Sequence, residues 1–292
     1  MKALFSYVVC LVCFLISSAS AATIYNNLTP NNMIGVASRP DLPGTFEIEA
    51  ADDFFLSGQT IITSASFVGL IVGGTGTPTI TDIVAEMYRI FPLDSNTVRM
   101  PNVPTRTNSP SDAALVTRDS AAGELTFNST VIAPTFTILN SIQPGGIHPF
   151  PLQTTGGNGQ LTGQEVQINL TFLTPFNLVD SHLFFVPQVA LSNGATFYWM
   201  SASRPITGAG GTTPFPTGVT DLQAWTRDAM LDPDWLRVGM DIVGGATPPA
   251  FNLAFSLDGT VVPEPPVSVV VLAGLSLICV GRLVGIRRSS RS

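Results

Sequence analysis

Apolar and polar residues alternate along much of this chain with the two-residue period of a β-strand. The clearest example is Glu165–Leu173, in which Val166, Ile168, Leu170 and Phe172 fall on one face and the residues between them are polar. Because successive side chains of a strand point to opposite sides, this pattern predicts a strand with one buried and one solvated face. Such strands are typical of antiparallel sheets.

Similar apolar segments recur between stretches rich in Gly, Pro, Asn and Ser, which favour turns. They predict eight further strands: Thr45–Ala50, Ile61–Val72, Ile83–Phe91, Gly123–Ile132, Leu183–Leu191, Ala195–Ala202, Leu236–Val243 and Phe251–Val262. A helical period is weak and is seen only at Thr220–Ala229. Since the segments do not repeat one another, we expect a mainly β fold over residues 22–262. A single jelly-roll-like β-sandwich fits this pattern better than a propeller.

The first 21 residues have the features of a secretory signal peptide, a helix that is removed after export. Lys2 supplies a positive start, Leu4–Ile16 is apolar, and Ala19 and Ala21 are the small residues of a cleavage site. The apolar run is shorter than the about 20 residues of a membrane span. We therefore expect export through the Sec translocon and cleavage at the end of segment 1–21.

The last thirty residues, 263–292, predict a membrane-sorting tail. Residues 267–286 are almost entirely apolar or small and predict a transmembrane helix. Arg287, Arg288 and Arg291, in the closing segment 287–292, predict that this helix stops in the bilayer with its arginines on the cytoplasmic side. A buried core helix would not account for the arginines, and a eukaryotic lipid-anchor signal would lack them.

Val262, Pro263, Glu264 and Pro265 stand directly before this helix. With this Pro-Glu-Pro motif, the apolar helix and the Arg-rich end, the chain resembles the PEP-CTERM family of exported bacterial proteins. The resemblance implies processing at or near residues 263–265 by an exosortase, a membrane-embedded protease with a cysteine nucleophile. It also implies an association with exopolysaccharide, whose production such systems accompany. An intermediate anchored in the inner membrane would then give a protein at the cell surface or in the extracellular matrix.

The middle of the chain is acidic and contains no cysteine. Between Ala22 and Val262, eight arginines stand against nineteen acids, which gives a net charge of −11. Such a surface repels phosphate backbones, so we expect no nucleic-acid partner. Cys10, Cys13 and Cys279 lie in the terminal segments, so the middle has neither a disulfide nor a thiolate metal site.

Residues suited to catalysis are sparse. His148 and His182 are far apart and lack the spacing of a metal hydrolase, and no G-x-S-x-G motif supports a serine nucleophile. A Ser-His-Asp triad stays open, because its members need not be close in sequence. We assign no catalytic residue from the sequence.

Carboxylates and tryptophans are the other candidates. Asp52 and Asp53, near Glu47 and Glu49, suit a structural turn or cap, oxygen ligands for Ca²⁺, or a catalytic pair. Calcium is the only cofactor that the sequence suggests. Trp225 and Trp235 lie in a region rich in Asp and Arg, where they either pack in the core or expose a face that stacks on sugar rings. For the acids around these tryptophans, Asp228, Asp232 and Asp234, we expect ion pairs with Arg227 and Arg237.

These features favour a noncatalytic, polysaccharide-associated protein of the cell surface or extracellular matrix. One alternative is a secreted glycan-acting hydrolase with paired carboxylates, and another is a calcium-stabilised adhesion module. The long irregular stretches Pro92–Ala122, Gln143–Gly163 and Arg204–Gly218 are expected to be functional or mobile loops, and the first two would supply ligand contacts.

Overall fold

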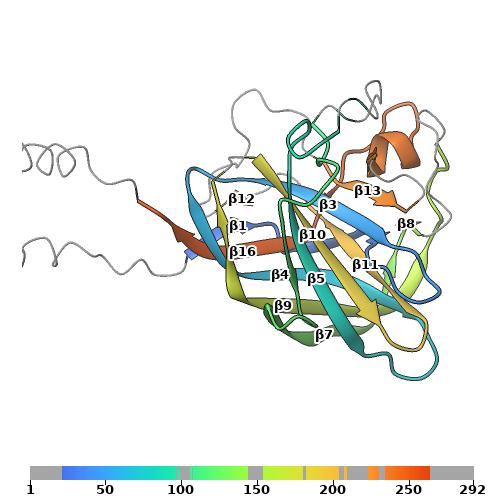
Figure 1. Ribbon diagram of the computed structural model, residues 1–292. Helices are drawn as coiled ribbons and strands as arrows, with labels where there is room; N and C mark the ends of the chain where they lie inside the picture. Colours follow the sequence, from blue (N-terminus) through green and yellow to red (C-terminus); the bar gives the residue numbers. More distant parts are fainter. Residues whose placement is uncertain are drawn as a thin grey trace, which may run out of the picture. The chain divides into compact units, whose positions relative to one another are not determined.

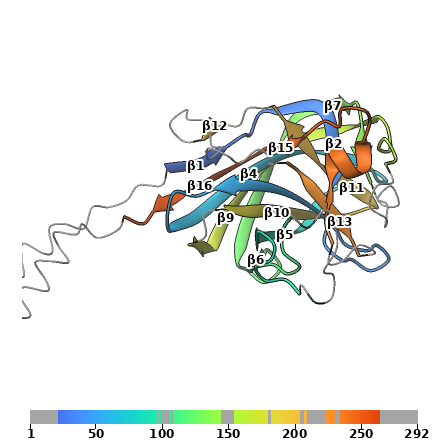
Figure 2. The same cartoon turned by 90° about the horizontal axis from the view of Figure 1, so that it is seen from above.

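Strands dominate the computed structural model, which describes residues 22–96, 98, 106, 108–143, 154–179, 182–203, 207–208, 223–229 and 234–263. They account for 61% of the described residues, and helical turns account for 4%. The predicted mainly β fold is therefore confirmed. The strands form two sheets within the unit that ends at Val261 (Figures 1 and 2).

The larger sheet has ten strands and is built around β4. β9 follows one edge of β4 and β7 lies outside β9; β16 and β11 share the other edge, and the sheet continues from them to β1 and β12 and to β2 and β8. Its strands are β1 (Ala22–Asn26), β2 (Pro30–Ala37), β4 (Thr60–Gly73), β7 (Leu125–Ile138), β8 (Ser141–Ile142), β9 (Leu161–Leu178), β11 (Ala195–Ala202), β12 (Thr207–Gly208), β15 (Asn252–Leu253) and β16 (Phe255–Val261).

The smaller sheet has six strands in the order β14-β13-β3-β10-β5-β6. Its strands are β3 (Ile48–Phe55), β5 (Ile80–Arg89), β6 (Val116–Asp119), β10 (His182–Leu191), β13 (Trp225–Asp228) and β14 (Leu236–Arg237). All its pairs are antiparallel. β14 runs into a π-helical turn, η2, at Val238–Val243.

One apolar core joins the two sheets, because alternate residues of both contribute to it. At its centre the Phe255 ring lies 4.3 Å from the Tyr25 ring, 5.5 Å from the Phe185 ring and 5.6 Å from the Trp199 ring, measured between centroids. Tyr25, Trp199 and Phe255 belong to the larger sheet, whereas Phe185 belongs to the smaller one. Fully burying each such ring contributes roughly 1.5–3 kcal/mol to stability.

β11 packs tightly against β4 because the facing residue is a glycine. A Cβ at Gly69 would lie 2.2 Å from the Phe197 ring and 2.7 Å from the Tyr198 carbonyl oxygen. No side chain fits in that space, so the close pairing of these two central strands requires glycine at position 69.

A second apolar cluster covers the opposite face of the smaller sheet. It consists of Ala51, Tyr88, Phe184, Val186, Trp225 and Trp235. The smaller sheet is therefore covered on both faces, although antiparallel sheets commonly leave one face in water. The segments that supply the cover lie after β5 and around β13.

Each predicted strand overlaps an observed one, although several begin or end a few residues outside it. Leu236–Val243 continues as a strand only to Arg237 before it becomes the π-helical turn, and the weakly helical Thr220–Ala229 contains strand β13. β1 and β2 are strands that the alternation did not indicate. The signal peptide, the transmembrane helix and the Arg-rich end lie outside the described residues. Across the ranges that are described, no helix has the length and apolar character needed to cross a membrane.

Candidate functional site

Charged side chains gather on the outer face of the smaller sheet, where the strand period places them. In β3, Ile48, Ala50 and Phe54 enter the core between the sheets. The alternate residues Glu49 and Asp53 therefore point to the other face, beneath the second apolar cluster. Both carboxylates are almost completely buried, at 3% and 1% exposure.

Glu49 belongs to a closed network with Arg227 and Tyr88. Arg227 donates from Nε to Glu49 Oε2. The Tyr88 hydroxyl accepts from Arg227 Nη2 at 3.0 Å and donates to Glu49 Oε1 at 2.6 Å. The guanidinium also stacks over the Trp235 ring, 4.5 Å from its centroid. These contacts satisfy a buried ion pair that would be costly if either partner were missing.

Glu86 lies beside this network, in surroundings that disfavour its ionised form. Its Oε2 lies 3.2 Å from the Tyr88 hydroxyl, and Thr117 donates to its Oε1 at 2.9 Å. Burial, and then the negative charge of Glu49, raise the pKa of Glu86 to about 7. Burial and Glu49 raise the pKa of Glu47 as well. Arg227 pairs with Glu49, whereas Glu86 is bound by the neutral donors Tyr88 and Thr117 and therefore holds a proton near neutral pH.

Two loops are tied together over the same face. Arg106 is ion-paired with Asp112 and Asp234. The Trp235 indole donates to the Ser111 carbonyl at 3.1 Å, and Arg227 Nη1 donates to the Asp112 carbonyl at 2.9 Å. The chain after β5 and the chain around β13 are therefore joined by charge-assisted hydrogen bonds above the sheet.

Asp52 and Asp53 lie in the middle of β3, so the prediction of a turn or cap is wrong for both. Asp52 faces the core, where its Oδ2 accepts from the Leu253 backbone N–H at 2.8 Å. Asp53 faces outward and its Oδ2 lies 3.0 Å from His182 Nε2. Side chains of successive strand residues point to opposite faces of the sheet, so these two carboxylates cannot bind the same calcium ion. Nor do any three His, Cys, Asp or Glu residues of the described ranges form a group that could hold a metal.

His182 is held in an aromatic setting beside Asp53. Its ring stacks on Phe55 at 4.3 Å between centroids and lies 5.3 Å from Phe184. Burial lowers the pKa of His182 to about 4, so the neutral ring donates from Nε2 to Asp53. In the part of the chain that the structure describes, no serine hydroxyl hydrogen bonds to this imidazole. His148 lies outside that part.

Trp225 and Trp235 pack in the second apolar cluster and are 0% and 1% exposed. Neither ring can stack on a sugar in this structure. Of the two roles that the sequence allowed, both tryptophans have the one of core packing. Ion pairing is present nearby, as predicted, and Asp234 pairs with Arg106. Arg227 pairs with Glu49, and Arg237 pairs with Asp241 at 2.9 Å. Asp232 lies outside the described residues.

The outer face of the larger sheet has a different character. Two rows of polar residues cross β7, β9, β4, β16 and β1, with directly paired residues in each row; they consist of Asn128, Asn169, Ser66, Ser256 and Asn26, and of Thr126, Thr171, Ser64, Asp258 and Thr23. The strands lie side by side in Figure 1. Residues paired across antiparallel strands share a face, so the rows form one polar surface, in which Ser256 is buried and the other members are partly or fully exposed. Asp258 is its only charged residue.

Hydrogen bonds within this surface, which we call the polar rows, align its side chains. Asn169 donates to Asn128 at 3.0 Å and accepts from Ser66 at 2.8 Å, and Gln167 also donates to Asn169 at 2.7 Å. In the other row Thr23 donates to Asp258 at 2.9 Å. Neighbouring strands are about 4.8 Å apart, so hydroxyl and amide groups recur at short, regular intervals. Periodicity in Glu165–Leu173 predicted the solvated face of β9, but the pairing of the strands lies beyond a single sequence.

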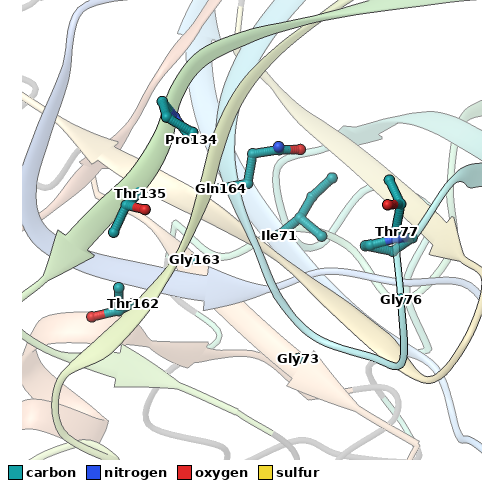
Figure 3. Close-up of a pocket in the computed structure, with 10 residues that line it drawn as sticks. Ile71, Gly73, Gly76, Thr77, Pro134, Thr135, Thr162, Gly163 and Gln164 are labelled. Carbon is teal, nitrogen blue, oxygen red and sulfur yellow. The ribbon is translucent and has the colours of Figure 1, made fainter.

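A groove of about 310 Å³ opens farther along β7 and β9, beside the loop that leaves β4 (Figure 3). Its lining carries no ionisable side chain; it consists of Ile71, Gly73, Gly76, Thr77, Pro78, Pro134, Thr135, Thr162, Gly163 and Gln164. In Figure 3 the Gln164 amide extends from β9 toward Ile71 and the loop with Gly76 and Thr77. The groove therefore suits an uncharged polar group.

Most of the predicted sorting residues fall outside the described ranges. Of the Pro-Glu-Pro motif only Pro263 is described, together with Val262, and Pro263 is exposed. Ala19, Ala21 and the three closing arginines are among the residues without a description. The chain matches no known protein-family model, no curated protein and no solved structure. Its function must accordingly be argued from the two outer faces.

We expect the Arg227→Met variant to lose about 3–5 kcal/mol of unfolding free energy, because Glu49 then stays buried without its cation. Urea denaturation of the full chain, followed by tryptophan fluorescence, measures this loss. Arg237→Met is the matched control and should cost less, since the Arg237 side chain is more exposed, at 19% against 7% for Arg227, and its partner Asp241 lies only four residues away. Adding Glu49→Gln to Arg227→Met should restore part of the stability. Equal losses for the two single variants would contradict this role for Arg227.

The raised pKa of Glu86 makes stability depend on pH. The pKa of this carboxyl is 4.5 in the unfolded chain and about 7 in the folded protein. Its contribution to the free energy of unfolding is therefore fully present below pH 4.5 and is lost as the pH rises to about 7. We expect the wild type to lose up to about 3 kcal/mol relative to Glu86→Gln over that range. Thr117→Val should move the upper limit of the range higher, because it removes a hydrogen bond that lowers the pKa. Urea midpoints at pH 4.5 to 8 that run parallel in wild type and Glu86→Gln would exclude the effect.

Proposed function

We propose that this chain is a noncatalytic protein of the cell surface or extracellular matrix, and that its folded unit binds polysaccharide. The observation that carries the proposal is the pair of polar rows on the outer face of the larger sheet. Export, an inner-membrane intermediate and exosortase processing at the Pro-Glu-Pro motif form the sorting part of the same proposal. That part rests on the resemblance to the PEP-CTERM family.

The polar rows have the chemistry that an extended sugar chain requires. Hydroxyl and amide groups donate and accept hydrogen bonds, as sugar hydroxyls do, and one charge among ten residues leaves the surface nearly neutral. The rows cross five strands at a spacing of about 4.8 Å, so a linear polymer meets similar groups along its length. The groove farther along β7 and β9 is likewise lined by uncharged residues.

The carboxylates of the smaller sheet support a noncatalytic protein. Glu49 accepts hydrogen bonds from both Arg227 and Tyr88, and the loops that carry Asp112 and Trp235 close over it. A carboxylate engaged in this way stabilises a fold. A catalytic carboxylate has to reach a substrate, and this one is 3% exposed.

A glycan hydrolase is the second candidate, and one observation favours it. The carboxyls of Glu49 and Glu86 both lie within hydrogen-bond reach of the Tyr88 hydroxyl, and the pKa of Glu86 is raised to about 7. Glycosidases use two carboxyls, of which one holds a proton near neutral pH. The calcium-stabilised adhesion module has less support, because Asp52 and Asp53 face opposite sides of β3.

The strand order supports a jelly-roll form for the sandwich. The larger sheet contains the sequence β2-β11-β4-β9 and the smaller one β3-β10-β5-β6. Strands that follow one another in the chain therefore alternate between the sheets, from β2 to β5 and again from β9 to β11. Two interleaved Greek keys produce this order in jelly rolls. In such folds the broad outer faces are rigid, which suits a binding surface.

We expect the full chain to be retarded in native gels that contain the host's exopolysaccharide, cellulose derivatives or dextran, and to release no reducing ends from them. The double variant Ser64→Ala, Thr171→Ala should weaken retardation about tenfold or more, since each hydrogen bond contributes about 1 kcal/mol. The control Ser57→Ala, Thr81→Ala changes exposed hydroxyls outside the rows and should bind like the wild type. Sugar release that Glu86→Gln abolishes would favour the hydrolase, and equal binding by both double variants would exclude the polar rows.

Mature protein from the native host should lack the residues beyond the Pro-Glu-Pro motif, because the prolines keep this segment extended and open to a protease. Intact-mass measurement of the surface fraction tests this. Glu264→Ala, or alanine at Arg287, Arg288 and Arg291, should leave unprocessed protein in the membrane, whereas Arg39→Ala should be processed normally. Surface protein that retains Arg291 would disprove the sorting proposal.

A further inference from the structure

One edge of the larger sheet carries no charge. Among the described strands β7 pairs with β9 alone, so the other edge of β7 is unpaired there. No Lys, Arg, Asp or Glu occurs in Leu125–Ile138. Soluble proteins usually protect such edges with charged residues, prolines or bulges, because unpaired N–H and C=O groups recruit further strands.

Protection is present only in the second half of β7. Pro134 and two irregularities interrupt its pairing after Val131, and the Leu139 backbone N–H donates to the Asn32 carbonyl at 2.7 Å, which ties the end of the strand to β2. Leu125–Val131 remains regular. It contains neither proline nor glycine, and Val131 is 50% exposed. Four of its seven uncharged residues, Thr126, Phe127, Thr130 and Val131, are of types that favour strands. An uncharged, proline-free segment of this kind can pair with another strand.

We propose that Leu125–Val131 pairs in antiparallel fashion with the same segment of a second copy, about a two-fold axis at Asn128. A two-fold axis requires a surface complementary to itself. The Asn128 amide meets this requirement, because each copy can donate from Nδ2 to Oδ1 of the other. On the same face Thr126 comes opposite Thr130. On the other face Leu125 comes opposite Val131, and Phe127 comes opposite Ser129, so of these three pairs only the last joins an apolar to a polar residue.

Charge favours this edge over other surfaces of the molecule. The stretch from Ala22 to Val262 carries eight arginines and nineteen acids, so most faces of two copies repel each other. Leu125–Val131 is neutral, so it adds no repulsion of its own when two copies meet there. The pairing also makes the row that contains Asn128 and Asn169 continuous through both copies. The dimer does not depend on whether that row binds a polysaccharide.

A seven-residue strand pair is smaller than the about 1,600 Å² of a typical stable complex. We therefore expect a weak dimer whose population rises with concentration. Directly opposed residues of antiparallel strands have Cα atoms about 4.5–5.5 Å apart, which lies within the range of a disulfide. A cysteine at position 128 would consequently trap the dimer.

The test uses the full chain in mild detergent, with Cys10, Cys13 and Cys279 replaced by serine. We expect Asn128→Cys to form a disulfide-linked dimer on mild oxidation, and Thr171→Cys, which is exposed on the adjacent strand β9, to stay monomeric. Absence of cross-linking at position 128, or equal cross-linking at both positions, overturns the proposal. Circular dichroism confirms that both variants are folded.

An equilibrium measurement complements the trapping. In sedimentation equilibrium, Thr130→Lys should weaken dimerisation about tenfold or more, because each copy then brings a lysine to the edge. Thr171→Lys carries the same change one strand away and should dimerise like the parent chain. A parent chain that is monomeric at all concentrations, or a dimer that Thr130→Lys leaves unchanged, contradicts pairing through β7.

Discussion

The ion pair between Glu49 and Arg227 lies where the smaller sheet meets the loops that cover its outer face. The strand period fixes Glu49 on that face, because its neighbours Ile48 and Ala50 fill the core between the sheets. A buried carboxylate without a cation would be unfavourable by several kcal/mol. Arg227 removes this cost, and through the Asp112 carbonyl and the Trp235 ring it also fixes the two covering loops. The pair thus supports the second apolar cluster, which contains Trp235 and Tyr88.

The outer faces of the two sheets differ in character, and the proposed function rests on this difference. Apolar rings and paired charges cover the smaller sheet, so its acids are used to hold loops in place. The larger sheet leaves uncharged Ser, Thr, Asn and Gln side chains at the surface, aligned by strand pairing. Although the carboxyls first suggest chemistry, the accessible and regular groups are the neutral ones. For this reason we propose a binding surface on the larger sheet and no catalytic site on the smaller one.

Sequence patterns anticipated the β fold and most long strands, because alternation is a local property that a single chain displays. They failed where tertiary contacts decide. Trp225–Asp228 forms a strand because it pairs with β3, and the register that brings Asn128 beside Asn169 depends on β7 meeting β9. Asp52 and Asp53 looked like a cluster, yet their strand separates them onto two faces. The partner of Arg227 is 178 residues away, and no spacing rule identifies such a pair.

The uncharged edge of β7 borders the polar face of the larger sheet, so the proposed dimer and the proposed binding surface involve the same sheet. An acidic molecule keeps its copies apart through charge repulsion, which acts over roughly a Debye length of about 8 Å at physiological salt. Contact is then favoured at segments that contain no acid of their own, and Leu125–Val131 is such a segment. Because a neighbouring strand added there lies in the plane of the same sheet, it would widen the polar face without covering it. The absence of charge that exposes this edge thus also preserves the surface beside it.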